Sequence, residues 1–314
     1  MFKKFAIFTV ITALTLSVVG CNKKETKETK ENLKVTMILD EGGINDGSFN
    51  ESSYEGLVKA QQELGIEISY LESKQEADYA ANIETAIDNE NDLIIGVGFK
   101  LADAFEEAAL NYPEQKFAII DSSYENTPEN LTSLMFNEEE SGYLVGLIAA
   151  KTTKTNVVGF VGGMDIPSCS NFAVGFEKAL KETNPEITLL KQYANSFTDA
   201  AKGKAIANQM ISKNADIIFA AGGGVNTGVY EICNENNIKA IGVDKPCNEE
   251  MPEVIITSAL KRVDVAVYNV IENLINNKFY GGTEIRYTIE NGGIDYEKTK
   301  HLDDELIKFV DSYK

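Results

Sequence analysis

The sequence predicts an α/β fold made of two lobes, each with a doubly wound parallel sheet. Short β-rich segments, such as "KVTMILD" at residues 34–40, alternate along the chain with helical segments such as residues 50–64. Strands that are apolar throughout and rich in β-branched residues are typical of parallel sheets covered by helices on both faces. The same alternation occurs twice, which predicts two similar lobes.

The spacing of the two halves supports an internal repeat. "DLIIGVG" leads to Asp121, which lies 29 residues after Asp92, and "DIIFAAGGG" leads to Asp244, which lies 28 residues after Asp216. The opening strands, at Val35 and Val157, precede those first aspartates by 57 and 59 residues. Ligands of doubly wound sheets bind at the carboxyl ends of the strands, so two facing units predict a cleft with a hinge.

The lobe boundaries follow from where the chain would cross the cleft. We expect a first lobe of residues 33–137 and 259–281, and a second lobe of residues 138–258 and 282–314. The last crossing would use the flexible Gly281–Gly282 pair.

The N-terminal residues have the pattern of a lipoprotein signal. Lys3 and Lys4 precede an apolar run at residues 5–19, which is short for a membrane span, so residues 1–20 are expected to be a signal peptide. A small residue directly before Cys21 predicts that Cys21 becomes the lipidated N-terminus, carrying palmitate or a similar acyl chain; the alternative is a plain signal peptide with an incidental cysteine. Residues 21–32 are polar after Cys21 and predict a disordered tether on the extracytoplasmic face of the membrane.

Composition excludes several classes of function. A formal net charge of −20 argues against nucleic-acid binding, which requires a basic face. The other three cysteines, Cys169, Cys233 and Cys247, are too few and too widely spaced for a disulfide framework, and the sequence leaves open whether Cys169 and Cys247 pair. His301 is the single histidine, so no metal site or cofactor is expected.

Three aspartates end predicted strands: Asp40 in "MILD", Asp121 in "AIID" and Asp244 in "IGVD". An ionised carboxylate only accepts hydrogen bonds, so it suits donors such as sugar hydroxyls and base N–H groups. The alternative for each is the N-cap of the following helix.

The segment "GGINDGSFNE" predicts a turn followed by a helix start, which Asn45, Asp46 or Ser48 can cap. Phe49 is either a hydrophobic staple on its own lobe or a stacking plate in the cleft. "YANSFTDAAKG" has the same character in the second lobe, with Ser196 expected as the cap and Phe197 in the turn. Two such rings could sandwich a flat ligand, and the absence of tryptophan favours a nucleobase over a sugar.

Two further features point to the cleft. "AAGGGVNTG" places Gly223 and Gly224 at a strand end, where backbone N–H groups approach a ligand or where a strand packs tightly on a helix. Its spacing fits neither the dinucleotide fingerprint nor the P-loop. Lys261 is expected to start a helix just after a crossing and either to reach the cleft or to be solvated.

Several motifs together resemble those of the basic membrane protein family of lipoproteins, which includes purine nucleoside receptors of ABC transporters. These are "ILDEGGINDGSFNESSYEGL", "GFVGG", "AAGGG", "GVD" and "TSALKRVDVAV", behind the Cys21 signal. The resemblance implies a type I periplasmic-binding-protein fold, with Asp40 on the base edge and Phe49 and Phe197 on the base faces. It also implies ribose contacts for Asp121, Asp244, Lys261 and a glycine of the run that holds Gly223 and Gly224, with Asp46, Ser48 and Asn50 shaping the pocket.

One segment departs from the family pattern. Similar proteins often continue the second-lobe aspartate as Asp-Ser-Asp-Gln, whereas this chain reads "VDKPCNEE", with Lys245 after Asp244. The substitution leaves the choice of base open.

The leading hypothesis is a monomeric, membrane-anchored receptor that closes around a purine nucleoside and delivers it to an ABC permease. A sugar receptor of the same fold is the alternative within this class. A surface nucleosidase using Asp40 and Asp121 is the enzyme alternative, and a surface protein with a vestigial cleft is the third. The sequence offers no nucleophile–base pair, so we expect no catalysis.

Overall fold

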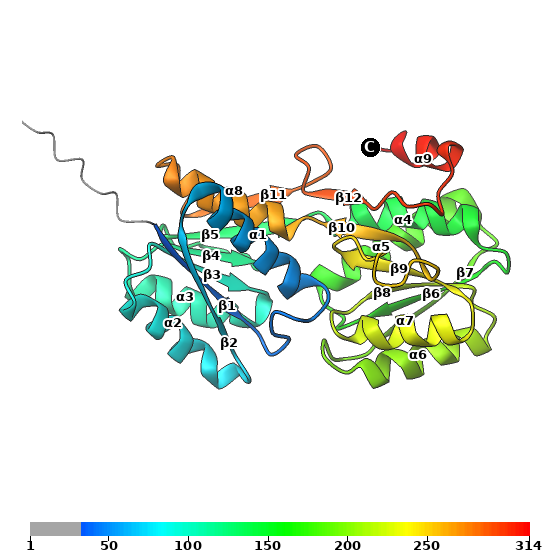
Figure 1. The fold of residues 1–314 in the computed structure, drawn as a ribbon, viewed down its shortest axis with the longest axis horizontal. Coiled ribbons are helices and arrows are strands. Elements are labelled where there is room, and N and C mark those ends of the chain that lie inside the picture. Colours follow the sequence, from blue (N-terminus) through cyan, green and yellow to red (C-terminus); the bar gives the residue numbers. More distant parts are fainter. Residues whose placement is uncertain (1–32) are drawn as a thin grey trace, which may run out of the picture. The chain divides into compact units, whose positions relative to one another are not determined.

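The computed structural model describes residues 33–314. The predicted signal peptide, the tether and Cys21 therefore lie outside the described residues. Within residues 33–314, no helix combines the length and apolar character that crossing a membrane requires. This part of the chain forms two six-stranded sheets, each flanked by helices (Figure 1).

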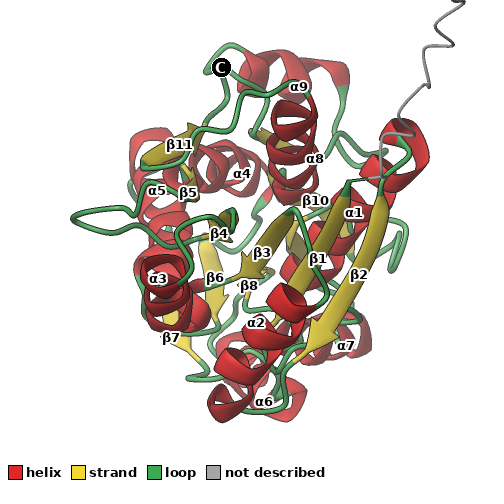
Figure 2. Ribbon diagram, turned by 90° about the vertical axis from the view of Figure 1, so that its left-hand side faces the viewer, coloured by secondary structure: helices red, strands yellow, loops and turns green. Residues whose placement is uncertain are grey.

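The first sheet is entirely parallel and has the strand order β11-β5-β4-β3-β1-β2. Figure 2 shows β2, β1 and β3 side by side in that order. Its strands are β1 (Lys34–Leu39), β2 (Glu67–Glu72), β3 (Leu93–Val97), β4 (Phe117–Ile120), β5 (Leu131–Phe136) and β11 (Thr283–Tyr287). Its helices are α1 (Phe49–Leu64), α2 (Tyr79–Asp88), α3 (Ala102–Asn111) and α8 (Val263–Ile275), with short 3-10 turns η1 (Glu76–Asp78) and η2 (Phe99–Leu101).

Alternation along β1 explains why helices cover both faces of the first sheet. Met37 and Leu39 pack in one core with Leu57 of α1 and Val267 of α8. Ile38, which points the opposite way, packs in a second core formed with helices α2 and α3. Because both faces are buried, the strand is apolar at almost every position, as the sequence pattern predicted.

The second sheet has the order β12-β10-β9-β8-β6-β7 and is parallel except for the β10–β12 pair. Its strands are β6 (Val157–Gly162), β7 (Thr188–Tyr193), β8 (Ile217–Ala221), β9 (Lys239–Asp244), β10 (Ile255–Lys261) and β12 (Ile294–Tyr296). Its helices are α4 (Glu138–Thr152), α5 (Pro167–Thr183), α6 (Ala200–Ser212), α7 (Val225–Glu235) and α9 (Asp304–Asp311). Phe160 and Phe219 pack against α4 and α5, whereas Val161 and Ile218 pack on the other face with α6 and α7.

Equivalent glycines in the two lobes show the repeat in three dimensions. A Cβ on Gly56 of α1 would lie 2.4 Å from the Asp264 carbonyl oxygen in α8, and one on Gly175 of α5 would lie 1.9 Å from the Glu139 carbonyl oxygen in α4. Both distances are shorter than any van der Waals contact, so only glycine permits these helix pairs to approach so closely. The prediction of two doubly wound α/β lobes is confirmed.

Three segments connect the lobes, and they lie side by side. The Asn137 amide donates to the Tyr287 carbonyl at 2.9 Å, and the Arg262 amide donates to the Gly293 carbonyl at 2.9 Å. Residues 259–261 were assigned to the first lobe but instead end β10 of the second sheet. The third segment also differs from the expectation, because residues 283–287 were assigned to the second lobe. They instead form β11, which pairs with β5 from Thr283 to Tyr287, so the chain leaves the first sheet after Tyr287. Pairing with β5 satisfies the backbone hydrogen-bonding groups of residues 283–287. The flexible Gly281–Gly282 pair suggested an earlier crossing and gave no sign of this strand.

Candidate functional site

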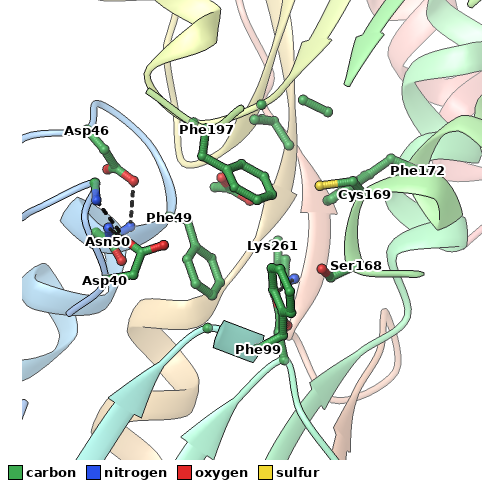
Figure 3. Close-up of a pocket in the computed structure, with 18 residues that line it drawn as sticks. Asp40, Asp46, Phe49, Asn50, Phe99, Ser168, Cys169, Phe172, Phe197 and Lys261 are labelled. Carbon is green, nitrogen blue, oxygen red and sulfur yellow. Dashed lines mark hydrogen bonds and ion pairs between the residues drawn. The ribbon is translucent and has the colours of Figure 1, made fainter. Parts of the chain in front are cut away.

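A cavity lies where the carboxyl ends of the strands of both sheets meet (Figure 3). Residues from both lobes border it. Those that the sequence predicted are Asp40, Asp46, Phe49, Asn50, Asp121, Phe197, Gly223, Asp244 and Lys261.

Two predicted residues do not border the cavity. Ser48 is buried, and its hydroxyl donates a hydrogen bond to the carboxylate of Asp244, so it joins the first lobe to the second. Gly224 directly precedes α7, and a Cβ there would lie 3.2 Å from the Phe197 carbonyl oxygen. Gly224 therefore allows close packing against the Phe197 loop, while Gly222 and Gly223 face the cavity.

The backbone is unusual at two equivalent strand ends. Asp121 follows β4 with φ of 61°, and Asp244 ends β9 with φ of 68°. Few residues other than glycine adopt this left-handed region, and such conformations cluster at ligand sites. The same rare geometry therefore turns one carboxylate from each lobe toward the cavity.

Lys261 is the centre of a buried charge cluster. Its ammonium lies 2.5 Å from Asp121 Oδ2 and 2.9 Å from Glu138 Oε1, and the residue is 1% exposed. Its Nζ also lies 5.2 Å from the centre of the Phe49 ring. Lys261 is the last residue of β10, which corrects the expectation that it starts a helix; α8 begins at Val263.

Burial controls the protonation of these carboxyls. It raises the pKa of Asp244 to about 6, although Lys261 and the Ser48 hydroxyl act to lower it. Burial also raises the pKa of Asp121, again against the effect of Lys261. Burial by itself would lower the pKa of Lys261, but Asp121, Glu138 and Asp244 outweigh it and keep this ammonium charged.

The turn before α1 is organised by two aspartates. The Asp46 carboxylate accepts from the backbone amides of Ser48, Asn50 and Glu51 at 2.9, 3.0 and 3.1 Å, which is the capping role expected of this segment. Burial raises the pKa of Asp46 against these three bonds. Asp40 Oδ1 accepts from the Asn50 amide group at 2.8 Å and from the Gly42 backbone amide at 2.9 Å.

Aromatic rings from both lobes border the cavity, as Figure 3 shows for Phe49, Phe99, Phe172 and Phe197. The centres of the Phe99 and Phe197 rings lie 6.4 Å apart, in an edge-to-face arrangement. In the Phe197 loop, Asp199 caps α6 by accepting from the Lys202 amide at 3.0 Å. Ser196 was expected to cap this helix, but its hydroxyl accepts from the amides of Thr198 and Asp199 within the preceding turn.

Sequence reasoning missed several neighbours of the cavity. Phe99 lies two residues after the end of β3, in "GVGF", so its position near a strand end was a usable signal. Ser168, Cys169 and Phe172 come from the start of α5, where nothing in the sequence distinguishes them from a packing face. Glu138 contacts Lys261 across 123 positions of sequence, which no local pattern can reveal.

The described residues contain neither a disulfide nor a metal-binding cluster. Cys169, Cys233 and Cys247 are free and buried, so the Cys169–Cys247 pairing that the sequence left open is not formed. Within residues 33–314, no group of three or more histidine, cysteine, aspartate or glutamate side chains could hold a metal ion. The arrangement instead offers ligand-binding groups: carboxylates, an ammonium and aromatic faces.

Comparisons with known proteins identify relatives over nearly the whole described chain. A family model described as "ABC transporter substrate-binding protein PnrA-like" matches residues 33–313. The ABC transporter nucleoside-binding protein BmpA of Lactococcus lactis is 34% identical over 315 residues, which cover 92% of this chain and 90% of that protein. Basic membrane protein A of Borreliella burgdorferi is 36% identical over 285 residues, which cover 89% of this chain and 84% of that protein.

Solved structures of ABC transporter solute-binding proteins also resemble this chain. A solute-binding protein of an ABC transporter system from Aeropyrum pernix superimposes with a TM-score of 0.80 at 31% identity, covering 88% of this chain and 78% of that one. Another ABC solute-binding protein, from Conexibacter woesei, has a TM-score of 0.74 at 22% identity, covers 89% of this chain and 94% of that one, and so bears on the fold alone. The predicted periplasmic-binding-protein fold is confirmed.

Proposed function

Because the chain belongs to the family of PnrA-like ABC transporter substrate-binding proteins, we propose that it captures purine nucleosides in the interlobe cavity for uptake by an ABC permease. The name of the Lactococcus lactis relative, which specifies nucleoside binding, supports this substrate class. The observation that carries the proposal is that Phe49 and Phe197, from different lobes, border one cavity that also holds buried carboxylates. A planar base between two rings and a hydroxyl-bearing sugar on carboxylates fit these two features together.

The ribose end is proposed to lie on the Lys261 cluster. Asp121 Oδ1 is buried and has no hydrogen-bond partner among the described residues, while Oδ2 is occupied by Lys261. A buried acceptor without a donor is unfavourable, so a ligand hydroxyl that donates to it would gain a full hydrogen bond. Asp244 and Lys261 border the same end of the cavity and would supply a further acceptor and a donor.

The base end is proposed to lie against the first lobe. Asp40 and Asn50 sit beside Phe49, where they can receive the N–H groups of a base edge (Figure 3). No catalytic step is part of the proposal, because a substrate-binding protein needs only to bind and release its ligand. Delivery requires a membrane location, and we propose that lipidated Cys21 provides it through the tether of residues 21–32.

Calorimetry with the purified protein tests the proposal. Adenosine, guanosine and inosine should bind with one site per chain, and free ribose should neither bind with comparable affinity nor compete with them. Chromatography of the incubated nucleoside should recover it intact. Binding of ribose alone would favour a sugar receptor, release of free base would show a nucleosidase, and no heat with any nucleoside would refute the proposal.

A further inference from the structure

The amide of Asn50 has a fixed orientation. Asn50 is the second residue of α1, is 2% exposed and borders the cavity. One end of its amide lies 2.8 Å from Asp40 Oδ1, which also accepts from the Gly42 amide. A carboxylate oxygen can only accept, so the amide end that faces it must be the NH₂ group. The other end of the amide, the carbonyl oxygen Oδ1, is therefore the end that can accept a hydrogen bond from a ligand.

Two acceptor atoms at this end of the cavity receive no hydrogen bond within residues 33–314. Asn50 Oδ1 is buried with no hydrogen-bond partner among residues 33–314. Asp40 uses Oδ1 for its two bonds and leaves Oδ2 to accept from a ligand. The neighbouring Asp46 carboxylate is occupied by three backbone amides. This base-edge pair, Asp40 and Asn50, thus offers two free acceptors, while the Asn50 NH₂ group is turned toward Asp40.

Purine bases differ in how they match two acceptors. Guanine presents two adjacent donors, N1–H and the 2-amino group. Hypoxanthine presents N1–H alone. Adenine presents its 6-amino group next to N1, whose lone pair would face the acceptors and repel them. We infer that the base-edge pair makes guanosine the preferred purine nucleoside of this protein. This inference rests on the nucleoside binding proposed above.

The unmodified protein and four ligands test this selection by competition titration. Loss of a hydrogen bond to a charged or buried group costs about 10- to 100-fold in affinity. Inosine, which lacks the 2-amino group, and 1-methylguanosine, which lacks N1–H, should each bind at least about 10-fold more weakly than guanosine. Adenosine should be weaker by a similar or larger factor.

The outcomes separate this inference from the proposed function. Equal affinity for guanosine, adenosine and 1-methylguanosine would refute the selection and leave nucleoside binding intact. Tighter binding of adenosine than guanosine would also overturn it. Failure of all four nucleosides to bind would refute the proposed function itself.

A matched pair of variants assigns the selection to Asn50. Asn50→Ala removes the unpaired carbonyl oxygen and should reduce the guanosine-to-adenosine affinity ratio by about 10-fold. Ser53→Ala is the control, because Ser53 is also buried on α1 but its hydroxyl donates only to the Phe49 carbonyl, at 2.8 Å. The ratio should be unchanged in Ser53→Ala. An unchanged ratio in Asn50→Ala, with the protein folded by circular dichroism, would contradict the assignment.

Discussion

Lys245, the neighbour in sequence of the cavity residue Asp244, connects the two lobes, and its charge should hold the closed form together. It follows β9 of the second sheet, and its ammonium lies 3.0 Å from Glu51 and 3.7 Å from Glu55, both on α1 of the first lobe. A third carboxylate, that of Glu250 in the second lobe, lies 4.0 Å away. Opening the cleft by hinge motion would separate Lys245 from α1, so these two cross-lobe ion pairs exist only when the lobes are closed.

Replacing Lys245 with methionine removes the charge and keeps an unbranched apolar side chain. The Lys245 side chain is 14% exposed and those of Glu51 and Glu55 are 34% and 53% exposed, so values for partly exposed ion pairs apply. Each such pair contributes about 0.2–1 kcal/mol. Two of them give about 0.5–2 kcal/mol, and nucleoside affinity should fall by about 2- to 30-fold in Lys245→Met. The loss should appear mainly as faster dissociation, because the ion pairs act in the closed complex.

The control is Lys204→Met. Lys204 lies 2.7 Å from Glu235 and 3.5 Å from Glu231, so it also serves two carboxylates, but all three residues are on α6 and α7 of the same lobe. Dissociation of radiolabelled guanosine, chased with unlabelled guanosine, should be faster in Lys245→Met and unchanged in Lys204→Met. Raising the salt from 20 to 300 mM should weaken binding less in Lys245→Met than in the unmodified protein. Identical dissociation rates and salt dependence in both variants would refute the closed-form role of Lys245.

Three further predictions follow from the site and the N-terminal signal. Phe49→Ala should weaken nucleoside binding by about 1–3 kcal/mol with little change in melting temperature; a large drop in melting temperature with normal affinity would mean that Phe49 only supports the core. Burial raises the pKa of Asp244 to about 6, so the contribution of Asp244 to the stability of the ligand-free protein should decline as pH rises through 6. Nucleoside affinity should instead decline as pH falls below 6, because a protonated Asp244 is a poorer acceptor. Calorimetry at pH 5 and 7.5 checks this, and constant affinity would contradict it. Cys21→Ser should release the protein into the soluble fraction of cells, and retention in the membrane fraction would refute the lipid anchor.

The lobes and much of the site could be predicted because local chemistry repeats at fixed spacing. Asp121 and Asp244 each close an apolar strand in the same position of the repeat, and both adopt the left-handed backbone there. The boundary after Tyr287 could not be predicted, because β11 is a short edge strand whose partner, β5, lies far away in the sequence. Edge strands are only partly buried, so they lack the continuous apolar pattern that marks central strands.

The roles of charged residues were less predictable than their positions. The sequence showed Lys245 only as part of a departure from the family pattern that left the choice of base open. Its contacts with Glu51 and Glu55 depend on how the second lobe meets α1. Glu138 was not singled out because a glutamate in the first turn of a helix is usually a solvated partner of the helix dipole. Here it is 2% exposed and shares Lys261 with Asp121, which only the packing of three distant segments can produce.

The charge of this cluster limits the chemistry of the ligand. Asp121, Glu138 and Asp244 surround the single ammonium of Lys261, so the fully ionised cluster carries excess negative charge in a buried place. A second anion would add to a repulsion that burial strengthens, whereas neutral hydroxyls would donate to the carboxylates without adding charge. Asp121 Oδ1, which has no hydrogen-bond partner in the described part of the chain, needs a donor of this kind. We therefore expect the cavity to favour nucleosides over nucleotides, because a phosphate brings negative charge and no donor that these carboxylates could use.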